Sequence, residues 1–184
     1  MGVRVQIYSW EKVIMKVFKV NEKAEIPEFA TEGSSCFDLR ACLTDGTTVK
    51  AYNPHNKKLG LPVRINSGSE IYVQIPPQFR VLIPSGLIFS IPNHHEVKIY
   101  PRSGIALKNG LTLANGTGVV DSDYVEETYM MLYNMSDTPM IVKDGDRVAQ
   151  ARMEKVLKYD LEESNLRPAK RTNRAGGMGS TGVE

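Results

Sequence analysis

Short segments of alternating apolar and polar residues, bounded by turn residues, run along nearly all of this 184-residue chain. Residues 36–43, CFDLRACL, are one example. If this segment is extended, Phe37, Leu39, Ala41 and Leu43 lie on one face, and Cys36, Asp38, Arg40 and Cys42 lie on the other. Helical periodicity is nearly absent. This pattern predicts an all-β sandwich or barrel.

The remaining elements are expected from the same pattern. Further strands are predicted at residues 15–20, 69–75, 79–84, 86–92, 95–101, 128–134, 140–143 and 146–156. The one helical turn predicted is 103–110, with Ser103 as its N-cap and Gly110 as its end. Residues 44–68 are polar and rich in turn residues, so we expect a long surface excursion between two strands.

Length and composition favour a single globular domain, because 41% of the residues are hydrophobic. We expect a β domain at 15–166, a possible N-terminal extension at 1–14, and a flexible, glycine-rich C-terminal arm at 167–184. Lys and Arg number 23 against 21 for Asp and Glu, which argues against direct nucleic-acid binding by bulk charge. The basic cluster Arg167, Lys170, Arg171 and Arg174 has no interleaved aromatic residue and does not change this view.

The compartment is inferred from signals that the sequence does not show. No segment has the apolar length of a membrane span or the pattern of a secretory signal. Within one strand, Cys36 and Cys42 would be roughly 20 Å apart, too far for a disulfide. We therefore expect a soluble protein with reduced thiols in the cytoplasm, or in the host cytoplasm if the protein is viral.

Two stretches carry side chains suited to phosphate chemistry. In 101–110, Arg102, Ser103 and Gly104 offer a guanidinium, a hydroxyl and free N–H groups at a helix start, which together form an anion site. An ordinary helix cap is the alternative. In 115–124, Asp121 and Asp123 are candidates for a general base or metal ligands, and turn aspartates are the alternative. No zinc site is expected from His55, His94 and His95.

Five stretches, taken in order, resemble the motifs of the homotrimeric dUTP diphosphatases (dUTPases). They are SSCFDLRA (34–41), PRSGIALKNG (101–110), NGTGVVDSDY (115–124), GDRVAQ (145–150) and GGMGSTG (176–182). The resemblance implies a jelly-roll-like β-barrel or sandwich with one short helix, and a homotrimer with shared active sites. The implied reaction is Mg²⁺-dependent hydrolysis of dUTP to dUMP and pyrophosphate, which limits uracil in DNA and supplies dUMP for thymidylate synthesis.

The resemblance also assigns roles to residues. Asp121 is the expected base for the water that attacks the α-phosphorus, and Asp38 is expected to hold Mg²⁺ through water. The expected phosphate-binding residues are Arg102, Ser103, Gly104, Gln150, Arg174, Gly179, Ser180 and Thr181. The expected uracil- and deoxyribose-binding residues are Asn115, Gly118, Val120, Tyr124 and Met178.

The sequence departs from the family pattern at three places. Glu126 stands where the family usually has glycine, and Met178 stands where it has the phenylalanine that stacks on the base. Asn173 occupies the usual place of the arm arginine, so Arg174 is favoured for that role over Arg171. Two alternatives remain: a dCTP deaminase-like or bifunctional enzyme of the same fold, or a nucleotide-sensing protein with reduced turnover that binds a partner through 44–68.

Overall fold

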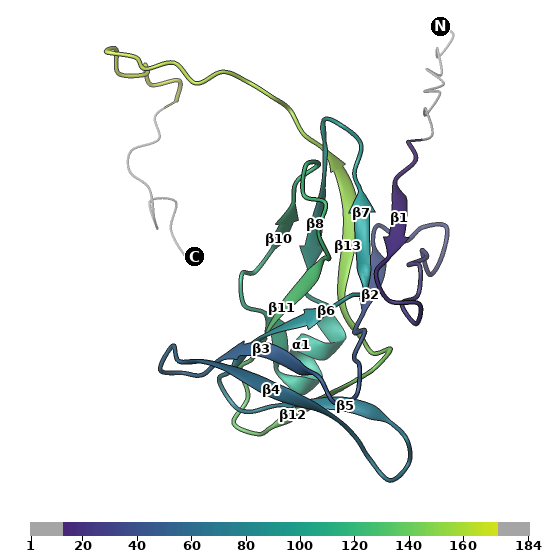
Figure 1. Ribbon diagram of the computed structural model, residues 1–184. Helices are drawn as coiled ribbons and strands as arrows, with labels where there is room; N and C mark the ends of the chain where they lie inside the picture. The colour runs from purple at the N-terminus through teal and green to yellow at the C-terminus, as the bar shows by residue number, and fades with distance from the viewer. Residues whose placement is uncertain (1–12, 173–184) are drawn as a thin grey trace, which may run out of the picture.

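Residues 13–172 are described in a computed structural model, in which they form thirteen strands and one helix (Figure 1). All strand pairs are antiparallel. The small sheet joins β1 (Lys16–Lys19) and β7 (Leu87–Ser90). The four-stranded sheet has the order β10 (Gly118–Val120), β8 (His95–Tyr100), β13 (Arg147–Lys155) and β2 (Phe37–Arg40). The seven-stranded sheet has the order β12 (Met140–Lys143), β5 (Ile71–Ile75), β4 (Lys58–Ile65), β3 (Thr48–Tyr52), β6 (Arg80–Pro84), β11 (Tyr129–Asn134) and β9 (Leu111–Leu113).

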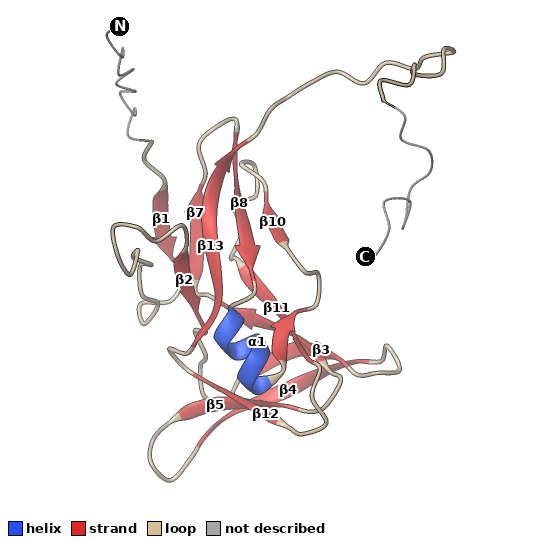
Figure 2. Cartoon of the chain, turned by 180° about the vertical axis from the view of Figure 1, so that it is seen from behind, coloured by secondary structure: helices blue, strands red, loops and turns tan. Residues whose placement is uncertain are grey.

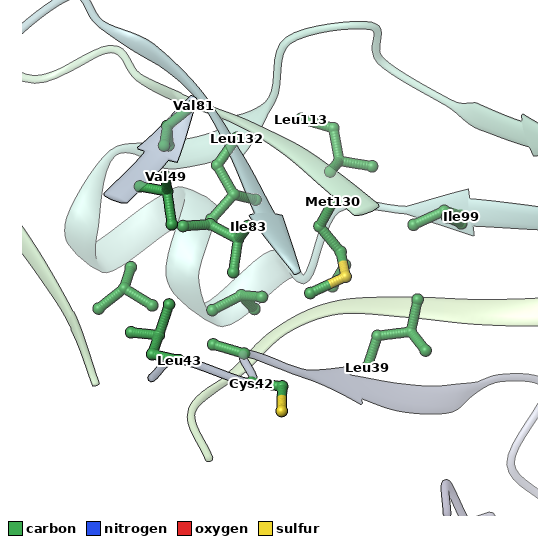
Figure 3. Packing of buried hydrophobic residues seen from close by; sticks show 14 of the residues in the cluster. Leu39, Cys42, Leu43, Val49, Val81, Ile83, Ile99, Leu113, Met130 and Leu132 are labelled. Carbon is green, nitrogen blue, oxygen red and sulfur yellow. The ribbon is translucent and has the colours of Figure 1, made fainter. Parts of the chain in front are cut away.

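One hydrophobic core joins the sheets, as the alternating pattern predicted. Val81 and Ile83 of β6 are buried, while the residues between and beside them are half-buried. Met130 and Leu132 of the neighbouring β11 are fully buried and lie close to Ile83 (Figure 3). Leu39 of β2 belongs to the same cluster. The expected all-β fold with one short helix is therefore confirmed (Figure 2).

The expectation of a surface excursion at 44–68 is wrong. This segment forms the β3–β4 hairpin, and β3 pairs with β6 inside the seven-stranded sheet. Its inward side chains, Val49, Ala51, Leu61 and Val63, are all buried. Figure 3 places Val49 in the same cluster as Val81 and Ile83. The hairpin is thus part of the domain core, and only its outward face is free to contact a partner.

Two local predictions also need correction. Helix α1 spans Ser103–Asn109, but its N-cap is Arg102 and no side chain caps it, so Ser103 is the first helical residue. Gly110 ends the helix with φ 63°, as expected. Strand β2 is shorter than the alternation suggested, and Cys42 beyond it is buried rather than facing outward with Asp38. Cys36 and Cys42 are both free thiols.

The chain leaves the body of the domain after β13. Figures 1 and 2 show the described part of the segment that follows running away from the sheets. Residues 156–172 form no strand or helix, and Leu157, Leu161 and Leu166 are each more than 80% exposed. Within residues 13–172, no helix has the length and apolar character needed to cross a membrane.

Candidate active site

An aspartate between two arginines joins three of the sequence stretches. Asp38 lies on β2, where it pairs with Gln150 of β13, and Gln150 in turn pairs with Tyr100 at the end of β8. The Asp38 Oδ1 atom is 2.8 Å from Arg102 Nε, and its Oδ2 atom is 3.1 Å from Arg147 Nη1. We call Asp38, Arg102 and Arg147 the arginine–aspartate cluster.

Arg147 was not among the residues singled out from the sequence. Its guanidinium binds Asp38, and its backbone carbonyl accepts a 2.7 Å hydrogen bond from Arg102 Nη1. The two arginines are therefore held at a fixed spacing. The available signal was its place in the fourth stretch, GDRVAQ, at the start of the strand that lies beside Asp38.

The other expected phosphate-binding residues of this part of the chain lie around the same cluster. The Gln150 amide donates a 2.9 Å hydrogen bond to the Pro101 carbonyl, which ties β13 to the start of the helix. Ser103 and Gly104 are exposed in the first helical turn, directly after Arg102. The first N–H groups of a helix have no partner within it, and so they can bind an anion. The cluster and this turn together form a surface suited to phosphate oxygens.

The turn between β9 and β10, which pair with other strands and not with each other, provides a second group of expected site residues. Strands β9 and β10 flank a turn in which Gly116 has φ 69°. A Cβ atom at Gly118 would lie 3.2 Å from Ile99 Cβ and 3.5 Å from Asn115 Nδ2, so this close approach favours glycine. Residues of this turn and of β10 border a cavity of about 280 Å³, which we call the β10 pocket. Its lining includes Asn115, Gly118, Val120, Asp121 and Tyr124, all of which were predicted from the sequence.

The segment after β10 is a turn rather than an extended chain. The Tyr124 N–H donates to the Asp121 carbonyl at 3.1 Å, and residues 121–127 form no strand or helix. Asp121 and Asp123 are exposed, and the extended arrangement that would put both on one face is absent from this turn. Asp121 is therefore the carboxylate that borders the β10 pocket, and Tyr124 lies beside it with 41% of its surface exposed.

A half-buried carboxylate holds the far end of this turn. Glu127 Oε1 accepts a 2.7 Å hydrogen bond from the Gly86 N–H, and Oε2 accepts a 2.8 Å bond from the Tyr129 hydroxyl. The bond to Glu127, together with burial, raises the pKa of Tyr129 to about 12, so the hydroxyl remains protonated and donates at neutral pH. Tyr129 was not singled out from the sequence, because an aromatic residue in a β-strand gives no functional signal on its own.

The structure does not bring the two groups together within one chain. Asp121 follows Val120, which pairs with Val97, so Asp121 is level with Glu96 near the start of β8. Asp38 is level with Tyr100 at the other end of β8, two strands away. At the usual rise and strand spacing, the two carboxylates are separated by about 13 Å along the sheet and about 14 Å across it, or about 20 Å in total.

The described residues offer a limited set of metal ligands. No group of three or more His, Cys, Asp or Glu side chains within residues 13–172 could hold a metal ion. Asp38 is a single carboxylate, and both of its oxygens are engaged by arginines. These donors fit a divalent cation that is bound mainly by substrate phosphates and reaches Asp38 through water.

Most of the residues predicted for the C-terminal arm lie outside the part of the chain that the structure describes. Arg174, Met178, Gly179, Ser180 and Thr181 lie outside the described residues. Arg171, the alternative to Arg174, is described and exposed in the segment that leaves the domain.

The fold is that of solved dUTPases. The dUTPase of Staphylococcus bacteriophage 80alpha, solved with dUpNHpp, matches 94% of this chain and all of its own chain with a TM-score of 0.68 at 17% identity. A dUTPase from Streptococcus mutans matches 79% of this chain and 98% of its own with a TM-score of 0.59 at 20% identity.

Sequence relatives give the family. A protein of Rhizobium rhizogenes named deoxyuridine 5'-triphosphate nucleotidohydrolase is 38% identical over 86% of this chain and 86% of its own length. A protein of the same name from Caulobacter vibrioides is 32% identical over 99% of this chain and 96% of its own length. The sequence model of the dUTPase family matches residues 65–182. The chain belongs to the dUTPase family, which favours the hydrolase over the deaminase-like alternative.

Proposed function

We propose that this chain hydrolyses dUTP to dUMP and pyrophosphate by attack of water on the α-phosphorus. Family membership supports this reaction, and so does the dUpNHpp-containing 80alpha structure. The observation that carries the proposal is the β10 pocket, which has Asp121 and Tyr124 on its border. A nucleoside in this pocket would lie next to a carboxylate able to accept a proton from water.

The β10 pocket would select the nucleoside. The Asn115 amide and the backbone from Gly118 to Val120 provide polar groups for a uracil edge, and a mismatched base would leave these groups unpaired. The Tyr124 ring would pack under the deoxyribose, leaving no room for a 2′-hydroxyl. From the arm, Met178 would cover the base.

The arginine–aspartate cluster would bind the phosphates. Arg102, Ser103, Gly104 and Gln150 lie together at the start of the helix, with Arg147 beside them. Asp38 holds both guanidinium groups in place, so little reorganisation would be needed when phosphate oxygens arrive. Arg174, Gly179, Ser180 and Thr181 would complete this binding from the arm.

Mg²⁺ is the metal that we propose, and it would supply charge neutralisation of the triphosphate. Asp38 would hold it through water, because the carboxylate is balanced by two guanidinium groups and is not a direct ligand in this arrangement.

We propose that the active protein is a homotrimer with shared sites. The separation of about 20 Å between Asp121 and Asp38 means that one chain cannot offer both to the same triphosphate. A neighbouring copy would have to supply one of them, as closed symmetric assemblies allow. The outward face of the β3–β4 hairpin is the proposed place for any further protein partner.

Release of pyrophosphate from dUTP, dCTP, dTTP and UTP tests this function. The intact protein should act selectively on dUTP, and Asp121→Asn should reduce turnover by a factor of about 100 or more. Equal turnover in both proteins would remove Asp121 from its role. A chain ending before Arg174 should remain a trimer but lose most of its turnover, and full activity without the arm would contradict the proposed arm contacts.

A further inference from the structure

Tyr124 borders the proposed nucleoside site, yet it lies in a turn that no strand pairing supports. Residues 121–127 form neither strand nor helix, and Tyr124 is 41% exposed. Its hydroxyl donates a 3.0 Å hydrogen bond to the backbone carbonyl of Glu127. The position of the Tyr124 ring therefore depends on where residue 127 is held.

Glu127 is held by a rigid part of the domain. Its carboxylate accepts the Gly86 N–H at 2.7 Å. Gly86 has φ 70°, and a Cβ atom there would lie 2.7 Å from Ala24 Cβ and 2.8 Å from Cys42 Sγ. The Gly86 carbonyl also accepts the Val20 N–H at 2.8 Å. Residue 86 is thus fixed by its neighbours, which makes it a firm anchor for the Glu127 side chain.

Tyr129 fixes the second oxygen of the same carboxylate. Its hydroxyl donates to Glu127 Oε2 at 2.8 Å, and hydrogen bonds to a charged acceptor are stronger than those between neutral groups. The Tyr129 side chain also forms part of the wall of the β10 pocket. On its other side it lines a cavity of about 480 Å³, which Glu127 and residues of the β3–β4 hairpin also border.

We propose that Glu127 and Tyr129 are positioning residues that set the place of the Tyr124 ring and thereby the preference for deoxyribose over ribose. This inference rests on the proposed function of the β10 pocket. The Glu127 carboxylate is held on one side by the Gly86 N–H and on the other by the Tyr129 hydroxyl. The backbone carbonyl of Glu127 in turn binds the Tyr124 hydroxyl, which completes the connection. When this connection is weakened, the ring can move and a 2′-hydroxyl is no longer excluded.

The variants that test the proposal differ by one interaction at a time. Tyr129→Phe removes the hydroxyl but keeps the ring in the pocket wall. Glu127→Ala removes both carboxylate bonds, and Glu127→Gln keeps one acceptor oxygen, so its effect should be intermediate. Tyr133→Phe is the matched control, because Tyr133 lies on the same strand and donates to Gln78 away from the β10 pocket. Glu126→Gln controls for charge, since Glu126 is exposed beside Glu127.

The measurement is kcat/KM for dUTP and for UTP, with circular dichroism and thermal unfolding to confirm folding. Tyr129→Phe and Glu127→Ala should lower the dUTP-to-UTP ratio of kcat/KM by about tenfold, the size expected for loss of a hydrogen bond to a carboxylate. We expect the change with dUTP to lie mainly in KM, because Tyr124 would contact the sugar before and during the reaction. If the role were purely structural, the variants would lower kcat/KM equally for dUTP and UTP, and the ratio would not change.

Binding of dUMP and UMP by calorimetry separates this proposal from the proposed reaction. Wild-type protein that binds dUMP in preference to UMP, with a preference lost in Tyr129→Phe, supports the positioning role even if turnover is absent. The positioning role is overturned if the wild type hydrolyses dUTP selectively and Tyr129→Phe and Glu127→Ala are as selective as the control Tyr133→Phe. That result would leave the proposed reaction intact. Protein that neither turns over dUTP nor distinguishes the two nucleotides contradicts both.

Discussion

The Arg102 guanidinium lies 2.8 Å from the Asp38 carboxylate, although Asp38 is on β2 and Arg102 is the N-cap of helix α1, far away in sequence. Both side chains are partly buried, with 27% and 23% of their surface exposed. Asp38 therefore orients the arginine that we propose to bind phosphate, in addition to its proposed contact with hydrated Mg²⁺. A substitution at Asp38 should affect both roles.

Asp38→Asn should lower turnover by a factor of about 10 to 100 and raise the Mg²⁺ concentration needed for half-maximal rate. The amide keeps the shape of the side chain but loses the charge that balances Arg102 and Arg147. Titration of Mg²⁺ against the initial rate measures both effects. An unchanged Mg²⁺ requirement would contradict the proposed water-mediated contact.

Gly86→Ala should lower the free energy of unfolding by about 3 kcal/mol, because a Cβ there would collide with Ala24 and Cys42 and φ is positive. Gly46→Ala is the matched control: its φ is 75°, but nothing lies within 4 Å of the added Cβ. Its cost should be about 1 kcal/mol, from backbone strain alone. Urea unfolding measures both, and equal losses would show that the close approach at Gly86 is relieved elsewhere.

Glu154→Gln should be less stable than the wild type at neutral pH, and the difference in stability between the two proteins should disappear in acid. Hydrogen bonds from Tyr100, Arg152 and Lys98 lower the pKa of Glu154 from 4.5 to about 2. Because the folded-state pKa is below the unfolded one, this stabilisation is complete above the unfolded value and is lost as pH falls toward 2. Urea midpoints at pH 7, 4 and about 2.5 follow this loss. A difference in urea midpoint that stays constant with pH would rule out this linkage. Glu163→Gln, in the exposed C-terminal segment, serves as the control.

Thr128→Val should leave stability unchanged within about 0.5 kcal/mol or increase it. Thr128 is 2% exposed, and its hydroxyl has no hydrogen-bond partner among the described residues. Replacing a buried, unpaired hydroxyl with a methyl group of similar size removes a desolvation cost. Thermal unfolding of the two proteins provides the comparison. A clear loss of stability would mean that solvent or a bound ligand satisfies this hydroxyl.

The sequence predicted most strands because alternation and turn residues coincide in them. Strand β12 has the predicted bounds of 140–143, and β5, β6, β8 and β13 differ from their predicted ranges by one or two residues at an end. The β3–β4 hairpin was missed because Gly60 and Pro62 interrupt its pattern. Pro62 is tolerated because it pairs with Thr48 at the end of the β3–β4 ladder, and the β4–β5 ladder begins only at Val63.

Candidate site residues were easier to find than their contacts. Arg102, Gln150 and Asp38 were selected from short polar stretches, and the strand register accounts for their proximity. The contribution of Tyr129 depends on a hydroxyl that reaches back two residues to Glu127, which no sequence period encodes. Contacts of this kind depend on the path of a turn, and turns are specified by tertiary packing as much as by local residues.

The order of strands β10, β8, β13 and β2 has a genetic consequence if sites are shared between chains as proposed. A chain mutated at Asp38 still carries an intact Asp121, and a chain mutated at Asp121 still carries an intact Asp38. Any trimer that contains both mutant chains has one subunit interface at which an intact Asp121 meets an intact Asp38. Two alleles that are each inactive alone would therefore complement each other, restoring about a quarter of the normal activity at equal expression.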